Sequence, residues 1–255
     1  MEIWYALGIS ILFNFVMFLV AFRYKTDKLT DLSYAITFVA LAFYGMLSAE
    51  TLSSYKWVIS TMIIVWAVRI GTFLYVRIQK TGKDRRFDDK RDSFVRFGSF
   101  WLLQAVTVWT VMLAPLLFLN VGVDPVSGFV FAGVAIWTAG LLTESVADIQ
   151  KYSFTQNVKN KGKWIASGLW KYSRHPNYFG EILVWFGVYV FVVSGLNGAE
   201  QFAAMITPLF ITFLLLFVSG VPLLEQAADK KWGKLAAYKN YKSRTSILIP
   251  LPPKK

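Results

Sequence analysis

The sequence predicts an all-α integral membrane protein with seven transmembrane helices, and three observations carry this prediction. The chain of 255 residues is 56% hydrophobic and has a mean hydropathy of +0.48. Only 16% of its residues are charged, against about 25% in a typical soluble domain. Its apolar residues form runs of about 20 residues, a length that crosses a bilayer as a helix. A soluble helical core would have shorter apolar helices.

The apolar runs are expected to span the membrane in chain order as a single membrane domain, 1–255. The first run is long and has no basic residues before it, so we interpret it as a retained span and not as a cleaved signal peptide. Basic and apolar residues alternate over 224–241, which suits a helix lying at the headgroup boundary. The seven runs are 3–22, 32–48, 57–76, 97–119, 126–142, 178–193 and 202–224.

Lys and Arg are distributed very unevenly between the loops. Cytoplasmic loops collect these residues because they resist translocation, so the distribution predicts an outside N-terminus and a cytoplasmic C-terminus. It also accounts for the net charge of +12 without a nucleic-acid partner. Four segments hold all 27 except Lys56 and Arg69, namely 23–31, 77–96, 144–178 and the residues after 224.

The composition excludes several kinds of site. The chain has no cysteine, so disulfides, thiolate nucleophiles and cysteine-bound metals are excluded. His175 is the single histidine, whereas membrane di-iron oxygenases bind their metals with many histidines, so no metal site is expected. No Gly-x-Gly-x-x-Gly occurs among the 17 glycines, which argues against a Rossmann domain.

Charged residues lie where charge is costly in the middle of the chain. Arg69 is expected well inside the third span, where it either reaches to the headgroups or faces the bundle and holds an anion. Glu144 and Asp148 lie four residues apart on one helix face, either at a solvated helix end or near donors that offset their repulsion. The charge run Lys-Asp-Arg-Arg-Phe at 83–87 fits a solvated loop, a headgroup contact or part of a site.

The most informative segment is 168–181. Pro176 suits the first turn of a helix, where its missing N–H costs nothing. Asn177 and Glu181 then share one face of the sixth span, with Arg174 and His175 just before it, and Glu225 ends the seventh span. Acid, amide and basic groups at the inner rim of a bundle indicate a polar ligand. Arginines would bind phosphates and the acids would accept from amide or ribose groups, as a nicotinamide dinucleotide phosphate requires.

These residues carry a family resemblance. With Glu144-x3-Asp148 before it and the tail Tyr238-x-x-Tyr241…Ile249-Pro250 after it, the segment 168–181 resembles the steroid 5α-reductase family, in particular its compact bacterial members. The resemblance covers roughly 60–252, and the Tyr-x4-Asn-x3-Glu spacing starting at Tyr172 agrees with it. The Arg-His-Pro-x-Tyr element also occurs in isoprenylcysteine carboxyl methyltransferases, so an S-adenosylmethionine-dependent membrane methyltransferase is the alternative.

The resemblance implies a multi-pass protein of the bacterial inner membrane that reduces a carbon–carbon double bond conjugated to a ketone, as in a 3-oxo-Δ4-steroid. It implies that 1–125 lies on the substrate side, that 126–255 forms the reductase core, and that NADPH binds from the cytoplasm. The expected partners are a lipophilic enone and membrane lipids, with no protein partner. By position, the cofactor residues would be Arg69, Asp84, Arg85, Arg86, Glu144, Asp148, Lys151, Tyr172, Arg174, His175, Asn177, Glu181, Tyr238, Tyr241 and Arg244.

The chain departs from the family pattern where the ketone should bind. The family uses a glutamate early in span two and a tyrosine in span three, whereas this chain has Asp31-Leu-Ser-Tyr34 and Trp66. Asp31, Tyr34 and Tyr44 are therefore the candidate catalytic donors, although both tyrosines also fit an interfacial belt. A transporter is disfavoured, because the spans are odd in number and no repeat is visible.

Overall fold

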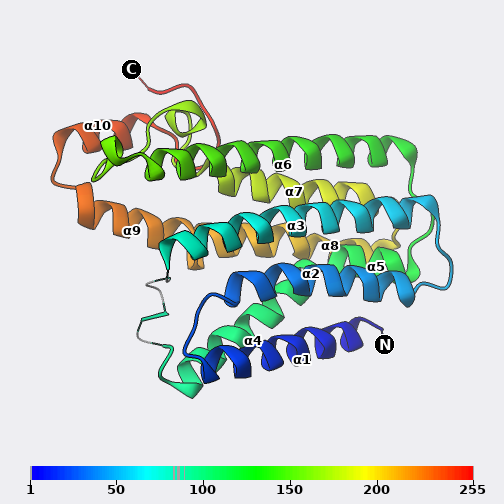
Figure 1. The fold of residues 1–255 in the computed structure, drawn as a ribbon. Coiled ribbons are helices and arrows are strands. Elements are labelled where there is room, and N and C mark those ends of the chain that lie inside the picture. The colour runs from blue at the N-terminus through cyan, green and yellow to red at the C-terminus, as the bar shows by residue number, and fades with distance from the viewer. Residues whose placement is uncertain (1, 83, 85–86, 89, 255) are drawn as a thin grey trace. The chain divides into compact units, whose positions relative to one another are not determined.

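The computed structural model describes residues 2–82, 84, 87–88 and 90–254, and the regular secondary structure in that part of the chain is helical apart from an isolated bridge between Ser173 and Ser246 (Figure 1). Seven of its helical segments are long and apolar enough to cross a membrane, which confirms the predicted number. Large apolar side chains on these helices face outward, as lipid-facing positions require; Phe131 and Phe202 are each 75% exposed. The orientation of the spans stays a prediction.

Most helices follow one another with short connections. The apolar runs account for the middle of each helix, while several helices continue into polar sequence beyond them. The described α-helices are α1 (Glu2–Arg23), α2 (Thr30–Leu47), α3 (Ser54–Thr81), α4 (Phe94–Val111), α5 (Leu113–Val121), α6 (Ser127–Gln156), α7 (Pro176–Val193), α8 (Gly198–Phe213), α9 (Val221–Trp232) and α10 (Ala236–Arg244). The two long connections lie between α3 and α4 and between α6 and α7.

The fourth span is interrupted where a single helix was expected. α4 ends at Val111 and α5 begins at Leu113. Pro115 explains the break, because it has no N–H to continue the ladder and its ring crowds the preceding turn. The Ala114 N–H donates instead to the Thr207 hydroxyl at 2.9 Å, so a side chain satisfies a backbone group that the break frees.

The seventh span is also irregular. α8 passes into a π-helical turn over Leu214–Val218, and the chain then bends at Gly220 before α9. A Cβ atom at Gly220 would lie 2.4 Å from the carbonyl oxygen of Leu215, so only glycine fits this bend. The bend separates the apolar part of the span from α9, which carries Glu225, Asp229 and two lysines.

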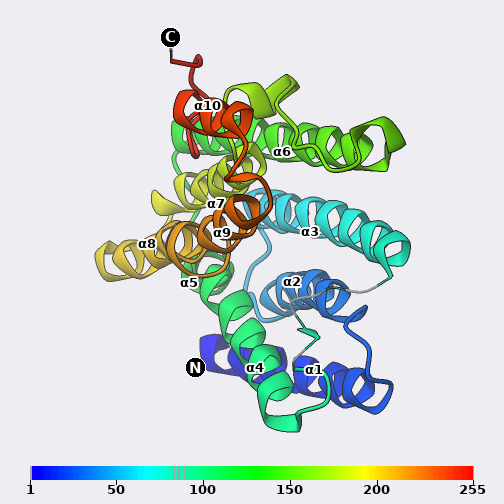
Figure 2. The ribbon, with the colours of Figure 1, turned by 90° about the vertical axis from the view of Figure 1, so that its left-hand side faces the viewer.

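The chain forms two compact units, and unit 1 comprises 1–130 with 189–207. In unit 1, α1 packs along α4 and α2 packs along α3, as both ribbon views show (Figures 1 and 2). Phe18, Phe97 and Trp101 form an aromatic core between α1 and α4, joined by Phe87 from the loop before α4. This loop is shorter than the expected 77–96, because α3 runs to Thr81 and α4 begins at Phe94.

Unit 1 also contains a buried polar network. Gln104 on α4 donates to Asn14 Oδ1 at 2.9 Å and to Ser33 Oγ at 2.8 Å, and Asn14 donates to Thr37 Oγ1 at 3.1 Å. Ser10 Oγ donates to the Ala105 carbonyl at 2.8 Å. These hydrogen bonds join α1, α2 and α4. In apolar surroundings such bonds are retained, because no water is present to replace a lost partner.

Unit 2 comprises 131–188 with 208–255, and a close helix pair organises it. A Cβ atom at Gly180 of α7 would lie 2.5 Å from the Glu144 nitrogen of α6, and one at Gly140 would lie 2.6 Å from the Val184 nitrogen. The two backbones therefore touch, as small residues permit in membrane helices. This contact fixes Glu144 against the turn of α7 that carries Asn177 and Glu181.

Candidate functional site

The segment before α7 presents the basic motif of unit 2. A 3₁₀ turn over Gly168–Lys171 begins with Gly168 at φ +59°, and the chain then passes through a turn at Tyr172 and a bend at 174–175 to Pro176, the first residue of α7. Proline at this position needs no hydrogen bond. Arg174 and His175 are therefore held immediately before the first helical turn, and Asn177 lies within it.

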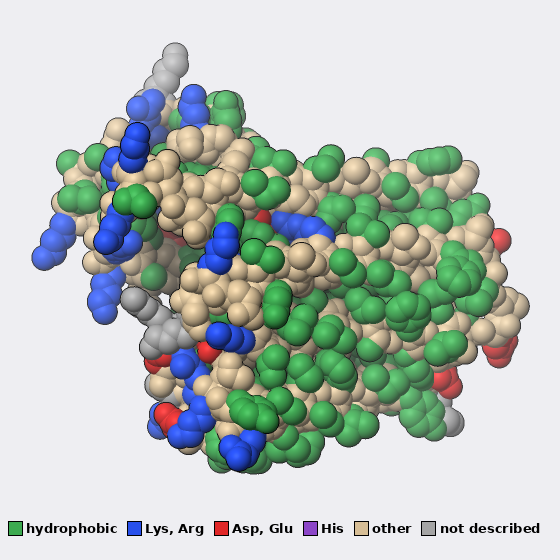
Figure 3. All heavy atoms as spheres, viewed as in Figure 1, with side chains coloured by type: hydrophobic (Ala, Val, Ile, Leu, Met, Phe, Trp, Pro, Cys, Tyr) green, Lys and Arg blue, Asp and Glu red, His purple; other side chains and the backbone are tan. Residues whose placement is uncertain are grey.

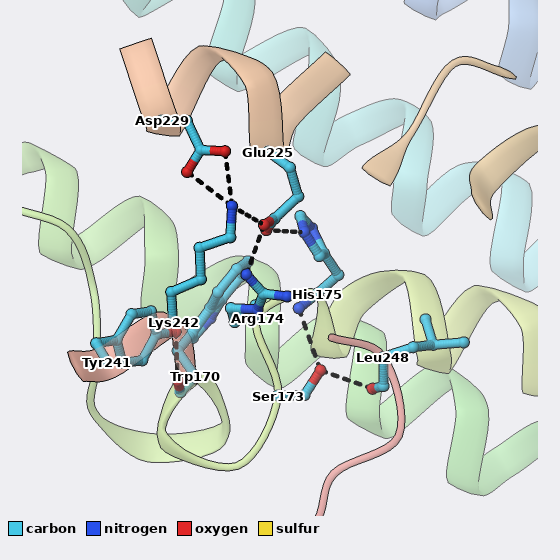
Figure 4. A network of polar contacts seen from close by, with 9 residues as sticks. All are labelled: Trp170, Ser173, Arg174, His175, Glu225, Asp229, Tyr241, Lys242 and Leu248. Carbon is cyan, nitrogen blue, oxygen red and sulfur yellow. Dashed lines mark hydrogen bonds and ion pairs between the residues drawn. The ribbon is translucent and has the colours of Figure 1, made fainter. Parts of the chain in front are cut away.

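An ion-pair network joins this motif to α9 and α10 (Figure 4). Glu225 accepts from Arg174 Nη1 at 2.5 Å, lies 2.9 Å from His175 Nε2, and pairs with Lys242 Nζ at 3.2 Å. Lys242 also contacts Asp229 at 2.6 Å. One carboxylate thus contacts two basic side chains that lie 50 and 51 residues before it in the chain and a third on α10.

The environment of His175 favours its neutral form. His175 is 4% exposed, and burial lowers the pKa of its imidazole, while the Glu225 carboxylate opposes this only in part. A neutral ring whose Nε2–H donates to Glu225 has a lone pair on Nδ1. Nδ1 is buried and has no hydrogen-bond partner among the described residues.

Two further buried atoms of the motif are also without a hydrogen bond in the described structure. They are the donor Nε of Arg174 and the acceptor Oδ1 of Asn177. Buried polar groups are nearly always paired, and leaving one unpaired costs about 1–3 kcal/mol. One unmet donor and two unmet acceptors within four residues therefore suit a bound ligand that both accepts and donates hydrogen bonds.

The C-terminal tail holds the motif from its other side. Ser173 Oγ donates to the Leu248 carbonyl at 2.6 Å and accepts from the His175 N–H at 3.1 Å (Figure 4). The Arg174 N–H donates to the Ser246 carbonyl at 2.8 Å, and the Leu251 N–H donates to Tyr172 at 3.1 Å. This tail therefore fixes the backbone from which the two basic side chains extend.

Aromatic residues support the same loop. Tyr241 Oη donates to the Trp170 carbonyl at 2.8 Å, and Trp170 Nε1 donates to the Ala147 carbonyl of α6 at 3.0 Å. Lys151 Nζ lies 4.5 Å from the centroid of the Trp170 ring. Burial raises the pKa values of Tyr241 and Tyr238, so both phenols stay protonated as hydrogen-bond donors.

The acids of α6 are buried and do not form a solvated helix end. Glu144 is 2% exposed and Asp148 is 6% exposed, because α6 continues to Gln156 instead of ending near 142. The contact between Gly180 and Glu144 brings this acidic face to the turn of α7 that bears Asn177 and Glu181. Unit 2 thus brings together most of the predicted cofactor residues.

Two of the predicted residues lie at the periphery of unit 2. Tyr172 is 40% exposed, and Lys171 Nζ lies 5.8 Å from its ring centroid. Arg244 is exposed, and its Nε donates to the Lys254 carbonyl at 2.6 Å, which closes the end of the tail on itself. The structure does not bring Arg244 into the Glu225 network.

The remaining predicted cofactor residues belong to unit 1. The Arg69 guanidinium lies 5.7 Å from the Phe73 ring centroid, so part of the side chain packs on an aromatic face. The Asp84 N–H donates to the Asp27 carboxylate and holds the loop between α3 and α4. Arg85 and Arg86 lie outside the described residues.

The three candidate ketone donors do not form one cluster. Asp31 pairs with Arg77 at 3.4 Å, and the Tyr34 ring packs edge-on to Phe38 with centroids 5.0 Å apart, so both lie at the start of α2. Tyr44 lies about 15 Å beyond Tyr34 and about 20 Å beyond Asp31 along the helix, at 1.5 Å per residue, and donates to Glu2 at 2.6 Å. Asp31 and Tyr34 are therefore neighbours, and Tyr44 is separate.

Lys242, Asp229 and Ser173 were not among the predicted site residues. Glu225 and Asp229 lie four residues apart on α9, and this spacing was the available signal. Nothing in the sequence pairs Lys242 with them, since α10 folds back only after the turn at 233–235. Among the described residues, no group of three or more acidic or histidine side chains is placed to hold a metal ion.

Comparison with known proteins gives the family. A family model described as "Protein of unknown function (DUF1295)" matches residues 17–245. The chain belongs to this family. DUF1295 proteins are related to steroid 5α-reductases, which confirms the coarser part of the resemblance without naming a particular member.

A curated relative points toward the alternative chemistry. The chain is 42% identical over 50 residues to the "Probable O-methyltransferase ustE" of Ustilaginoidea virens. The match covers 20% of this chain and 18% of that protein, so it concerns a small part of both. No solved structure matches the chain significantly.

Proposed function

We propose that this DUF1295 protein is an NADPH-dependent membrane reductase that saturates the conjugated double bond of a lipophilic enone, for example a 3-oxo-Δ4-steroid. The observation that carries the proposal is the trio of unmet buried atoms, Arg174 Nε, His175 Nδ1 and Asn177 Oδ1. A dinucleotide phosphate offers phosphate oxygens to the donor and amide or hydroxyl hydrogens to the acceptors. The relation of the family to steroid 5α-reductases supports the same ligand.

The residues of unit 2 fit this cofactor by their chemistry. Arg174 and Lys242 are cations for a phosphate, and Glu225 holds both in place until a phosphate joins them. Glu144 and Asp148 are buried acceptors suited to ribose hydroxyls or a carboxamide. Bound NADPH would supply a hydride to the β-carbon of the enone, and the protein would orient it and exclude water.

The ketone needs a hydrogen-bond donor, because negative charge develops on its oxygen as the hydride adds. One good hydrogen bond to that oxygen in a dry site is worth about 3–4 kcal/mol. We assign this role to Tyr34, whose ring packs against Phe38 and Trp66 with centroids 5.0 and 6.4 Å away. Asp31, three residues earlier, is the other candidate at this end of α2.

A second candidate function is an S-adenosylmethionine-dependent methyltransferase, because of the 42% identity to the probable O-methyltransferase over 50 residues. S-adenosylmethionine also both donates and accepts hydrogen bonds, so the trio of atoms would suit it too. It has no phosphates, however, so Arg174 and Lys242 would keep their ion pairs with Glu225 and gain no phosphate contact.

The two functions are separated by ligand binding and turnover. Thermal unfolding of the purified protein is measured with NADPH or S-adenosylmethionine, followed by NADPH oxidation with a panel of lipophilic enones that includes progesterone and testosterone. We expect stabilisation by NADPH and enone-dependent oxidation. Stabilisation by S-adenosylmethionine with indifference to NADPH would contradict the reductase and favour the methyltransferase.

A further inference from the structure

Unit 2 carries a basic surface that the proposed reaction does not use. Lysines extend from the segment after α6 and from α9, α10 and the turn between them, and Figure 3 shows blue side chains gathered over α9 and α10. All of these lysines are exposed. We call them the lysine platform; they are Lys159, Lys161, Lys163, Lys230, Lys231, Lys234 and Lys239.

An aromatic cluster beneath the platform holds its two halves together. Trp164, from the first half, packs against Trp232 and Tyr238 with ring centroids 6.1 and 5.2 Å away. Trp232 Nε1 donates to the Gly162 carbonyl at 2.6 Å. Two segments far apart in the sequence thus present one fixed array of charges instead of two independent tails.

The platform is not neutralised by nearby acids. Asp229 pairs with Lys242, and Glu225 pairs with Arg174, His175 and Lys242. Among the described residues, no carboxylate lies within ion-pair distance of a platform lysine. Lys231 Nζ lies 4.4 Å from the Trp232 ring centroid, which is a contact with an aromatic ring and not with an acid. Seven like charges are costly to hold together without a polyanionic partner.

Apolar side chains and span ends accompany these lysines. Val158 is 83% exposed beside Lys159, and Leu235 is 49% exposed beside Lys234. The platform also adjoins the ends of two candidate spans, because its first three lysines follow Gln156, and the other four lie just before or after Trp232. Exposed apolar and basic residues together at span ends are placed at the depth of lipid headgroups.

We propose that the lysine platform binds the headgroups of anionic phospholipids, with Val158 and Leu235 entering the boundary between headgroups and acyl chains. The charge complementarity favours an anionic partner, and the adjoining span ends make lipid the anion nearest to it. This inference is independent of the proposed reaction, because none of the platform lysines belongs to the Glu225 network.

The test uses the full chain in nanodiscs of phosphatidylcholine with or without phosphatidylglycerol. The protein is released from the nanodiscs, and the lipids that it retains are measured by native mass spectrometry. The variant combines Lys230→Gln, Lys231→Gln, Lys234→Gln and Lys239→Gln. The control removes the same charge from unit 1 with Arg23→Gln, Lys28→Gln, Lys80→Gln and Arg96→Gln. We expect the first variant to bind phosphatidylglycerol at least about tenfold more weakly, and the control to lose less.

Several results would overturn the inference. Equal retention of the two lipids by the unmodified protein, or an equal loss of affinity in the variant and the control, would contradict lipid binding by the platform. So would binding of soluble glycerol phosphate as tight as that of phosphatidylglycerol, or a preference for a DNA oligonucleotide over anionic vesicles. If the fourfold variant does not fold, Lys234→Gln with Lys239→Gln gives the same comparison, since both side chains are exposed. Raised salt should weaken binding in parallel, because the contacts are electrostatic.

Discussion

Both units bury polar side chains among apolar helices, but the network around Asn14 in unit 1 and the motif before α7 in unit 2 differ in how these side chains are satisfied. In unit 1 the network around Asn14 and Gln104 joins three helices, and none of its buried side-chain atoms lacks a hydrogen bond. In unit 2 the motif at Arg174 to Asn177 leaves three buried atoms unmet. Single buried atoms without a hydrogen bond also occur among the described residues of unit 1, at Ser53, Ser60, Arg91 and Trp101, so the motif is distinguished by having three such atoms within four residues.

The largest expected effect comes from removing the carboxylate that organises unit 2. Glu225→Gln leaves Arg174 and Lys242 without their shared counter-charge, so we expect a loss of roughly 3 kcal/mol in stability together with loss of NADPH binding. Thermal unfolding in detergent and NADPH titration measure both. Asp229→Asn is the control, because that carboxylate is exposed and its loss should cost under about 1 kcal/mol. Equal effects of the two changes would contradict the central role of Glu225.

The next effect tests the contact between α6 and α7. Gly180→Ala would place a Cβ 2.5 Å from the Glu144 nitrogen and force the two backbones apart. We expect a destabilisation of about 1–3 kcal/mol and weaker NADPH binding, because the backbone that carries Glu144 would move away from α7. Gly128→Ala on α6 meets no atom within 4 Å and should change neither quantity. Unchanged binding in Gly180→Ala would mean that the glycine contact does not position the site.

A change in unit 1 tests whether its polar network contributes to stability without contributing to NADPH binding. Asn14→Ala removes the partner of Gln104 and Thr37, and we expect it to lower stability by about 1 kcal/mol. It should leave the dissociation constant of NADPH unchanged, because this network has no unmet atoms to offer. Thermal unfolding and NADPH titration of the same preparation separate the two effects. A large loss of affinity would place this network in the ligand site.

The smallest effect concerns pH. The pKa of His175 is lowered by burial, so the unfolded chain binds a proton more readily than the folded protein does. The contribution of neutral His175 to stability is therefore complete above the usual histidine pKa of about 6.5, and it is lost as the pH falls through the lowered pKa of this residue. His175→Gln should flatten the stability profile below about pH 6.5. An unchanged slope in that variant would show that His175 does not titrate in this way.

The sequence predicted the number of spans because seven long apolar runs leave few alternatives. It did not predict the break at Met112 or the bend at Gly220, since these depend on Thr207 and on close contact with Leu215. The motif at 174–181 was recognisable from its local spacing. Its link to Lys242 through Glu225 was not, because Lys242 reaches Glu225 only where the turn after α9 folds α10 back.

The most direct test of the ligand site is NADPH binding to the purified protein and to two matched variants. Asn177→Ala removes one of the unmet acceptors of unit 2, and Asn14→Ala removes a satisfied amide of unit 1. We expect NADPH to bind the unmodified protein and Asn14→Ala equally, and Asn177→Ala about tenfold more weakly. Equal affinity in all three proteins, or no binding to any, would contradict the proposed ligand site.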